Sequence, residues 1–406
     1  MIVSLEEATR QEAGGKAALL GALARAGFPV PPGFVVPNGV YRAVTSGLDL
    51  PALLAERGPD EARRLIESAV LPPEFLSELT DAMKQLGNHP VAVRSSASTE
   101  DTAGQSAAGQ HDTFLGVTGP TAVAERLPAT WASLWSTRAV AYRATVTTAE
   151  VTEEMAVIVQ RHIDADVAGV LFTATPGTAT VIEASWGLGE SVVRGLVTPD
   201  AYTVTTAGVV DRRTGDKWTR IDRGGNGTVT RQVPPEAARR LCLNDQQLAE
   251  LAQLGEQVAE HLGAPQDIEF AIEDDRIWLL QARPVTAPLP QSGHIGVSTR
   301  RTRDLRGTAG SPGFVSGTAR VVHGPEDFRR VSPGDILVCR FTDPAWTPLF
   351  GVVAGVVTET GGRLSHAAIV AREHRIPAVL GVPCAMTTLH DGQVLTLDGT
   401  TGTVHT

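Results

Sequence analysis

The amino-acid sequence predicts an α+β fold spread over more than one domain. At 406 residues the chain is longer than one hydrophobic core usually organises, which favours two or three domains. Apolar residues at helical spacing dominate to about residue 87, and short apolar runs typical of strands follow. Residues 286–303 contain Pro, Gly, Ser and Arg without an apolar period. They predict a flexible linker between a first block, 1–285, and a second block, 304–406.

Composition narrows the classes of partner. A formal net charge of −10 argues against nucleic acid or an anionic membrane as the main partner. A nucleotide is not excluded, because a phosphate site needs only local positive charge. The first residues do not read as a signal peptide, and no apolar run approaches the length of a membrane span. Three widely spaced cysteines indicate reduced thiols. We therefore expect a cytoplasmic protein.

Each block has its own expected elements. In the first block, helices come before most of the strands, and a polar hairpin is expected at 203–232. The second block should contain short strands and one helix at 365–374. The remaining predicted elements of the first block are helices at 15–26, 121–148 and 244–262, and strands at 90–94, 155–161, 168–173 and 179–184, with DIEFAI and RIWLLQARP as its last strands.

One stretch of the second block points to an anion. Residues 358–373 read TETGGRLSHAAIVARE and follow the apolar run GVVAGVV. A strand, a glycine turn and a helix start place backbone N–H groups around whatever lies beyond the turn. The anion is either a bound ligand or a phosphoryl group carried on the histidine itself. On the residues alone, a histidine at a helix start is also compatible with a capping or surface role.

Longer motifs carry a resemblance to a known family. GGKAALLGAL, VAVRSSASTEDTAGQSAAGQHDTFLGV, SWGLGESVVRGLVTPD and WLLQARPV resemble the ATP-grasp domain of the dikinases: phosphoenolpyruvate synthase, pyruvate phosphate dikinase and rifampin phosphotransferase. GTAGSPGFVSGTARVV, DPAWTPLF and TETGGRLSHAAIVAREHRIPAVLGV resemble their phosphohistidine domain. The resemblance implies an ATP-grasp nucleotide-binding domain followed by a small β/β/α swivelling phosphohistidine domain. No stretch resembles the family's acceptor-binding domain, which we expect to be missing.

The resemblance implies an ATP site in the first block. Lys16 and Arg94 would hold the phosphates, and the glycines of AGQSAAG would let the backbone close over them. On the residues alone, Lys16 is also compatible with a solvated helix start, and AGQSAAG with a flexible surface loop. Further nucleotide-binding residues implied by the resemblance are Thr113, Gln160, Glu190 and Arg283.

Magnesium is implied at Glu269 and Gln281, which supply the oxygen ligands that this ion favours. A symmetric two-residue turn at 274–275 would place Glu269 opposite Leu280 and point Gln281 to the other face. For both to reach one ion, an odd loop such as 274–276 or a bulge is needed, and we predict that offset register. The alternate residues of the first strand, expected in the core, are Ile268, Phe270 and Ile272.

His366 is implied to be the nucleophile that takes a phosphoryl group from ATP and passes it on. Gly361 and Gly362 would leave space for the phosphoryl oxygens, while Ser365 and the helix N-terminus would donate hydrogen bonds to them. The linker of 18 residues could extend over roughly 60 Å, ample for a domain that swings between two sites. Candidates for further phosphate contacts are Thr358, Thr360 and Arg363.

Three functions follow from this pattern. The first is a dikinase-type phosphotransferase that uses ATP and Mg²⁺ and passes the phosphoryl group from His366 to a small hydroxyl or enol compound, with AMP and phosphate released. The second is a phosphohistidine carrier subunit, whose acceptor-binding domain lies on a separate protein. The third is a regulatory ATP-binding relic without turnover. The sequence identifies neither the acceptor nor its general base.

Overall fold

The computed structural model describes residues 1–97, 111–137, 139–140, 154–175, 178–225, 227–287, 289 and 304–406. The predicted glycine loop AGQSAAG and residues 288 and 290–303 of the predicted linker lie outside these residues. The chain forms two compact units. Unit 1 comprises 1–164, 222–229 and 275–283, and unit 2 comprises 165–221, 230–274 and 284–406.

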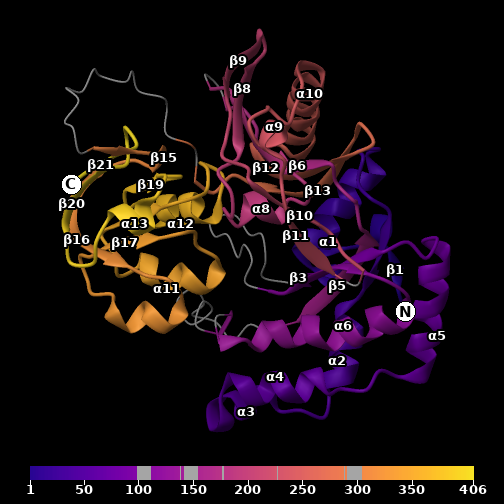
Figure 1. Cartoon of the computed structure of the whole chain (residues 1–406). Helices are drawn as coiled ribbons and strands as arrows, with labels where there is room; N and C mark the ends of the chain where they lie inside the picture. Colours follow the sequence, from indigo (N-terminus) through magenta and orange to yellow (C-terminus); the bar gives the residue numbers. More distant parts are fainter. Residues whose placement is uncertain are drawn as a thin grey trace. The chain divides into compact units, whose positions relative to one another are not determined.

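Unit 1 is built on a five-stranded sheet in the order β1-β2-β5-β3-β4. Helices α1 and α6 pack on β3 and β5, and α2 packs on β5. In Figure 1 the helices α2, α4 and α6 lie below these strands, while α1 lies above them. The elements of unit 1 are β1 (Val3–Ser4), α1 (Arg10–Arg25), β2 (Gly33–Val36), α2 (Asn38–Thr45), α3 (Leu50–Arg57), α4 (Pro59–Glu67), α5 (Pro73–Gln85), β3 (Val91–Ala97), β4 (Thr113–Val117), α6 (Pro120–Ala132), β5 (Met155–Arg161) and β13 (Arg276–Pro284).

Strand register divides this sheet into two chemically different faces. Val93 pairs with Val159, and both lie in a buried apolar cluster with residues of α2, α4, α5 and α6. Side chains alternate along a strand, so Arg94 and Ser96 point to the opposite face. The apolar core therefore covers one face and leaves the other for polar side chains.

Unit 2 contains most of a six-stranded sheet in the order β13-β12-β6-β7-β8-β9. Helix α10 begins with a capping box, in which Asn244 and Gln247 bond each other's backbone N–H, and it ends at the left-handed Gly263. It packs on β12, β6, β8 and β9, as Figure 1 shows. The elements of this part are β6 (Val167–Phe172), β7 (Thr180–Trp186), α8 (Glu190–Val193), β8 (Asp200–Thr205), β9 (Gly208–Arg213), β10 (Thr219–Arg223), β11 (Thr228–Gln232), α9 (Pro235–Ala238), α10 (Asp245–Leu262) and β12 (Gln266–Glu273).

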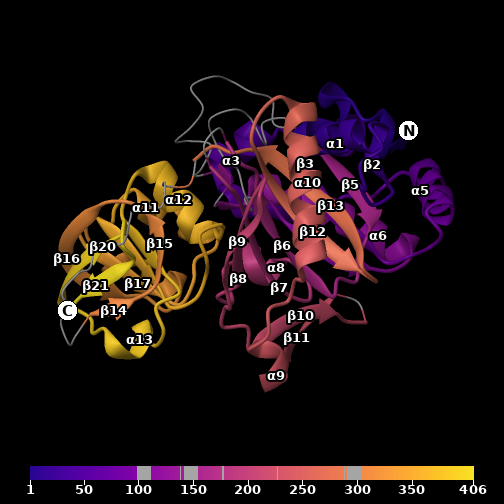
Figure 2. The ribbon, with the colours of Figure 1, turned by 90° about the horizontal axis from the view of Figure 1, so that it is seen from above.

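The C-terminal part of unit 2 is an eight-stranded sheet in the order β14-β21-β20-β16-β17-β18-β19-β15. Strands β16 to β19 run parallel in its centre, and α12 packs on β15, β18 and β19. Figure 2 shows these strands and helices as one block. The elements are β14 (Leu305–Arg306), β15 (Thr308–Ser311), β16 (Phe314–Val321), β17 (Ile336–Cys339), α11 (Thr347–Phe350), β18 (Gly355–Thr358), α12 (His366–His374), β19 (Ala378–Leu380), α13 (Ala385–Thr388), β20 (Val394–Asp398) and β21 (Thr403–His405).

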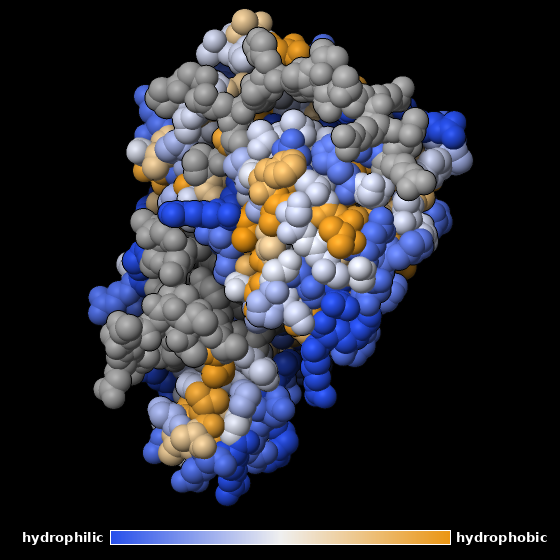
Figure 3. Space-filling view, turned by 90° about the vertical axis from the view of Figure 1, so that its left-hand side faces the viewer, coloured by the Kyte–Doolittle hydropathy of each residue, from blue (hydrophilic) through white to orange (hydrophobic). Residues whose placement is uncertain are grey.

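The outer surface of this sheet is mixed in character. In Figure 3, apolar groups in orange are interspersed with hydrophilic ones on the face that is turned to the viewer. Phe314 on β16 and Val394 on β20 are exposed, at 69% and 70% of their full area. None of the helices in the described part of the chain has the length and apolarity that a membrane crossing requires.

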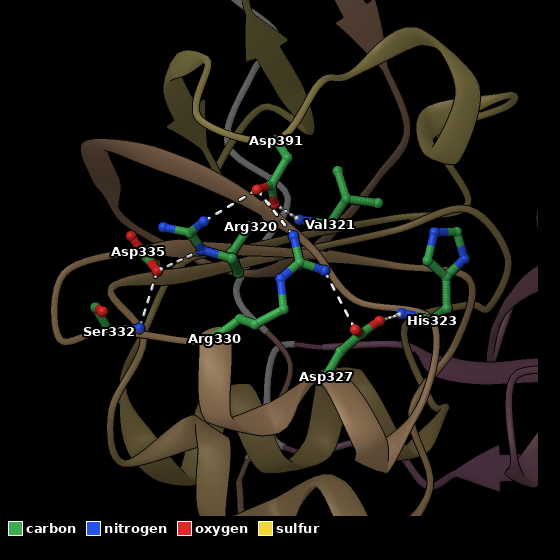
Figure 4. Close-up of polar contacts among 8 residues, drawn as sticks. All are labelled: Arg320, Val321, His323, Asp327, Arg330, Ser332, Asp335 and Asp391. Carbon is green, nitrogen blue, oxygen red and sulfur yellow. Dashed lines mark hydrogen bonds and ion pairs between the residues drawn. The ribbon is translucent and has the colours of Figure 1, made fainter.

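A network of charged side chains links segments at one edge of the C-terminal part of unit 2 (Figure 4). Asp391 accepts hydrogen bonds from Arg320 at 3.0 Å, from Arg330 at 2.9 Å and from the N–H of Val321 at 3.0 Å. Arg320 also bonds Asp335 at 3.0 Å. The network joins β16 to the loops before β17 and β20, so it stabilises the block that carries His366.

Candidate active site

The polar face of unit 1 gathers several predicted nucleotide-binding residues. Ser96 Oγ accepts the N–H of Ala17 at 3.0 Å and donates to Ala13 O at 2.6 Å, which holds the start of α1 against β3. Gly14 makes this approach because its φ is +75°, and an added Cβ would lie 2.2 Å from Ser96 O. The half-buried Lys16 follows directly. Gly14 therefore serves the close contact between α1 and β3.

Arg94 is held beside Gln281. Its guanidinium donates to Gln281 Oε1 at 2.7 Å and to the carbonyl of Leu280 at 2.6 Å. Thr113 is its partner across β3 and β4, so the two side chains lie on the same face. The structure thus brings together a predicted phosphate-binding cation, a predicted magnesium ligand and a predicted phosphate-side hydroxyl.

Three other predicted nucleotide-binding residues lie in different places. Gln160 is buried in the central strand β5, and its amide donates to Pro31 O at 2.8 Å, which accounts for its burial without a ligand. Glu190 is the first residue of α8 in unit 2, where burial raises its pKa and Arg194 opposes the rise. Arg283 is half-buried near the end of β13. Their roles at a nucleotide stay predictions.

The turn between β12 and β13 differs from the prediction. Strand β12 ends at Glu273 and β13 starts at Arg276, so the loop has two residues, and both are left-handed with φ of 51° and 61°. The predicted odd loop is wrong, because two consecutive left-handed residues form the symmetric hairpin turn. Regular pairing from this turn sets Glu269 across from Leu280. Only a bulge further along the strands would bring Glu269 to Gln281.

The burial of these strands identifies the core face of β12 but does not distinguish the two registers. Ile268, Phe270 and Ile272 are fully buried, which confirms the predicted core face. Leu279 is fully buried and Leu280 half-buried, while Trp278, on the same face as Leu280, is also buried. Within the described residues, no group of three or more His, Cys, Asp or Glu side chains is placed to hold a metal ion. Magnesium binding by Glu269 and Gln281 therefore stays a prediction, and the turn at 274–275 does not support it.

His366 is the first residue of α12, as predicted, and its side chain is buried. Its Nδ1 lies 2.9 Å from the hydroxyl of Thr342, which is also buried. Phe350 meets the imidazole edge to face, with 6.3 Å between ring centroids. These contacts restrain the plane of the ring and engage its Nδ1.

The loop before α12, residues 358–365, is called here the histidine loop. Several of its predicted phosphate donors bond protein groups in this structure. Thr360 donates to Gly195 O at 2.6 Å, and the N–H of Gly361 donates to Val197 O at 3.1 Å. The loop therefore lies against the segment that follows α8. Two further hydroxyls bond within the loop itself: Thr358 to Thr360 O and Ser365 to Gly362 O.

A buried carboxylate of β7 also contacts this loop. Glu183 Oε1 accepts the N–H of Arg363 at 2.7 Å, and Oε2 accepts that of Leu364 at 3.0 Å. An added Cβ on Gly362 would lie 2.2 Å from Oε2, so the space beside this glycine is filled by the carboxylate. Burial raises the pKa of Glu183, and the two N–H bonds oppose that rise.

Strand pairing places Glu183 in one row with a predicted magnesium ligand. Val170 on β6 pairs with Glu183 on one side and with Glu269 on the other. All three side chains share one face, with the two acids about 10 Å apart at two strand spacings. Leu364 and Ile369 pack on this face against Val170. The fold thus sets the histidine loop on the face that carries Glu269.

Helix α12, which begins with His366, is also hydrogen-bonded to the start of the predicted linker. Arg372 donates to Ala287 O at 3.3 Å, to Gly310 O at 2.9 Å and to Arg363 O at 2.8 Å. Thr286 donates to the carboxylate of Glu373 at 3.0 Å. Residues 286–287 were expected to belong to a flexible linker, but they are bonded to α12.

Sequence reasoning missed two residues that contact the histidine loop and its histidine. Thr342 directly precedes DPAWTPLF and shows no spacing that would single it out. Glu183 had a signal, since an acid inside the apolar run TVIEASW must be paired or neutralised if the strand is buried. Its partners came from residues 180 positions away, which no local pattern reveals.

Comparison with known families accords with this arrangement. A family model described as pyruvate phosphate dikinase, AMP/ATP-binding domain, matches residues 10–302. The chain belongs to this family. A second model, described as PEP-utilising enzyme, mobile domain, matches residues 331–402, which include α12 and His366. The predicted dikinase family and the predicted α+β multidomain fold class are thereby confirmed.

Several proteins similar to this chain carry the name phosphoenolpyruvate synthase. A probable phosphoenolpyruvate synthase of Methanothermobacter thermautotrophicus is 36% identical, over 97% of this chain and 61% of the relative. The phosphoenolpyruvate synthases of Pyrococcus furiosus and Aeropyrum pernix are 34% and 36% identical, each over 97% of this chain and 56% of the relative. The chain thus spans a little over half the length of these relatives.

Proposed function

We propose that this chain is an ATP-dependent phosphotransferase of the dikinase type, with His366 as its phosphoryl carrier. In this reaction an imidazole nitrogen forms a bond to the β-phosphorus of ATP as the bond to the AMP oxygen breaks. AMP leaves, the γ-phosphoryl group goes to water or phosphate, and the β-phosphoryl group stays on the histidine. Covalent catalysis of this kind divides one difficult transfer into two.

The observation that carries the proposal is the contact between Thr342 and His366. When Nδ1–H donates to the Thr342 hydroxyl, Nε2 holds the lone pair that a nucleophile needs. The hydroxyl and the Phe350 ring keep the imidazole in one orientation. This is what a carrier histidine requires, because an attacking nitrogen must be both unprotonated and aimed.

The nucleotide would be bound by the polar face of unit 1. Lys16 and Arg94 supply the positive charge that phosphoryl transfer needs, and Arg94 would exchange Gln281 Oε1 for a phosphate oxygen. Magnesium, when bound, would neutralise charge on the phosphate oxygens. Glu269 supplies a carboxylate for it, while Gln281 serves only if Arg94 releases it and a bulge brings the two together.

The acceptor is proposed from the names of the relatives. Several relatives are named phosphoenolpyruvate synthase. Pyruvate, in its enol form, is therefore the first acceptor to test. A second candidate function is a carrier that delivers the phosphoryl group from His366 to an acceptor-binding region on another chain.

Labelled ATP tests the proposal. The chain is incubated with β-labelled or γ-labelled ATP and Mg²⁺, and acid-labile label on the protein is counted. We expect β-label on the wild type and none on His366→Ala. Absence of label from both positions would refute the phosphotransferase and leave the regulatory relic. Turnover with pyruvate alone favours the enzyme, whereas transfer only to an added acceptor domain favours the carrier.

A further inference from the structure

We propose that Glu183 is a positioning residue that docks the histidine loop on the sheet of β6, β7 and β12, so that His366 is held in place to be phosphorylated. The proposal rests on the proposed function for its catalytic meaning. Its geometry rests only on contacts inside unit 2. Glu183 touches neither of the atoms that react, and it acts through the backbone of the loop.

The contact is bidentate and joins two segments far apart in sequence. Both carboxylate oxygens of Glu183 are used, one for the N–H of Arg363 and one for the N–H of Leu364. Each oxygen accepts a different backbone N–H, so one side chain restrains two consecutive peptide units. Leu364 is followed after one residue by His366, so the carboxylate fixes the backbone immediately before the carrier.

Gly362 is shaped for this carboxylate. Its φ lies outside the left-handed region, so its backbone would accept an alanine without strain. The three atoms nearest to the position of an added Cβ all belong to the Glu183 carboxylate, at 2.2 to 2.5 Å. The first glycine, Gly361, differs, because its φ of +107° requires glycine whatever the neighbours. The absence of a side chain at Gly362 therefore lets the loop approach the Glu183 carboxylate.

Apolar packing completes the docked surface. Leu364 and Ile369 are buried against Val170, Phe172 and Val181. Apolar packing of this kind stabilises the contact between the loop and the sheet but does not fix the exact position of the loop, because the hydrophobic effect is non-directional. The two N–H bonds to Glu183 supply direction, because a shift of the loop by one peptide would leave a fully buried carboxylate without its donors.

Amide hydrogen exchange tests the contact without reference to catalysis. In the unphosphorylated full chain, the N–H groups of Arg363 and Leu364 should be protected. Glu183→Gln should speed their exchange at least tenfold, because glutamine offers one acceptor oxygen and turns a donor toward the second N–H. Glu359→Gln is the matched control, since Glu359 accepts the N–H of Met386. It should leave the exchange at 363 and 364 unchanged. Unchanged exchange in Glu183→Gln would overturn the proposal.

Phosphorylation tests the positioning role. With β-labelled ATP, Glu183→Gln should slow the appearance of acid-labile label at least tenfold, while the Kd for ATP stays within about twofold of the wild type. A rate equal to that of the wild type, despite lost protection, would show that the contact does not position His366. If the wild type takes no label, the proposed function fails, and the exchange experiment still decides whether Glu183 docks the loop.

A double-mutant cycle guards against misfolding as the explanation. Gly362→Ala alone should undock the loop, speeding exchange at 363 and 364. In Glu183→Ala, which removes the clashing carboxylate, the added alanine should change the exchange by less than about twofold. Equal effects of Gly362→Ala in both backgrounds would refute the contact.

Discussion

The hydroxyl of Thr342 lies 2.9 Å from Nδ1 of His366, and both side chains are buried. Thr342 follows strand β17 and His366 begins α12, so the contact joins two elements that flank β18. It engages Nδ1 of the imidazole and restrains the orientation of the ring. Its removal is the most direct test of the chemistry at His366.

Thr342→Val should slow phosphorylation of His366 by about tenfold to a hundredfold, because the imidazole loses the hydrogen-bond partner that holds its orientation. Thr342→Ser keeps the hydroxyl and should retain most of the rate. The rate of β-label incorporation measures the effect, and NMR of the phosphorylated protein identifies the nitrogen that carries phosphorus. A Thr342→Val rate equal to that of wild type would contradict the assignment.

Arg94→Lys should raise the Kd for ATP at least tenfold. Lysine is a single point charge and cannot span Gln281 Oε1 and Leu280 O, or grip two phosphate oxygens, as the guanidinium does. Arg42→Lys is the control, since Arg42 pairs with Glu154 at an exposed site. Calorimetric titration of the nucleotide gives both constants. Equal Kd values for ATP in the wild type and in Arg94→Lys would show that Arg94 does not bind the nucleotide.

His162 should make the protein acid-sensitive. It is buried, and neither ring nitrogen has a hydrogen-bond partner among the described residues. Burial lowers the pKa of His162 to about 4, with Asp164 opposing the shift and Arg223 adding to it. The unfolded chain, with a histidine pKa of about 6.5, therefore binds the proton first as the pH falls.

Between about pH 6.5 and pH 4 the free energy of unfolding should accordingly fall by as much as about 1.4 kcal/mol per pH unit, from this residue alone. His162→Met should abolish that part of the slope, whereas replacement of the exposed His89 by Gln should not. Urea unfolding at pH 7.5, 6 and 5 measures it. Parallel slopes for wild type and His162→Met would contradict the prediction.

Asp391→Asn should lower the stability of the C-terminal block by about 1 kcal/mol, since Asp391 is the shared acceptor of Arg320, Arg330 and the Val321 N–H, and partial exposure screens the charges. Partial burial opposes ionisation, but these donors hold the pKa of Asp391 below its usual value. The stabilisation is therefore present above about pH 4 and lost below it.

Thermal unfolding of Asp391→Asn and of Asp81→Asn provides the comparison. Asp81 forms an exposed pair with Lys84 within one helix, so its replacement should cost well under 1 kcal/mol. Equal losses in the two variants would mean that the network of Figure 4 adds nothing beyond its separate pairs.

Local patterns sufficed for much of the fold. Strand β5 was predicted at its observed bounds, and α10 and α12 within a residue, because apolar spacing and capping residues act over a few positions. The turn at 274–275 was mispredicted, since the argument assumed that Glu269 and Gln281 share one ion. A functional assumption overrode the local preference of two consecutive aspartates for a symmetric turn.

Residues of the candidate site were predictable where a motif carried them. His366 and the glycines of its loop belong to one continuous stretch, and Lys16 and Arg94 each follow a recognisable local pattern. Thr342 and Glu183 were not predicted, because their partners are fixed by tertiary packing. Gly362 shows the same limit: its residue type was noticed, but the group that demands a glycine lies on another strand.

The hydrogen bond from Arg372 to Ala287 O bears on where the chain should be cut to prepare a C-terminal fragment. The guanidinium is buried, and burial lowers the pKa of Arg372 to about 10, so it stays a cation at neutral pH. A fragment cut to begin at Asp304 would strip this cation of one of its carbonyl acceptors and deprive Glu373 of the Thr286 hydroxyl. A cut ahead of Pro284 keeps both, and is the better starting point for studying the histidine helix in isolation.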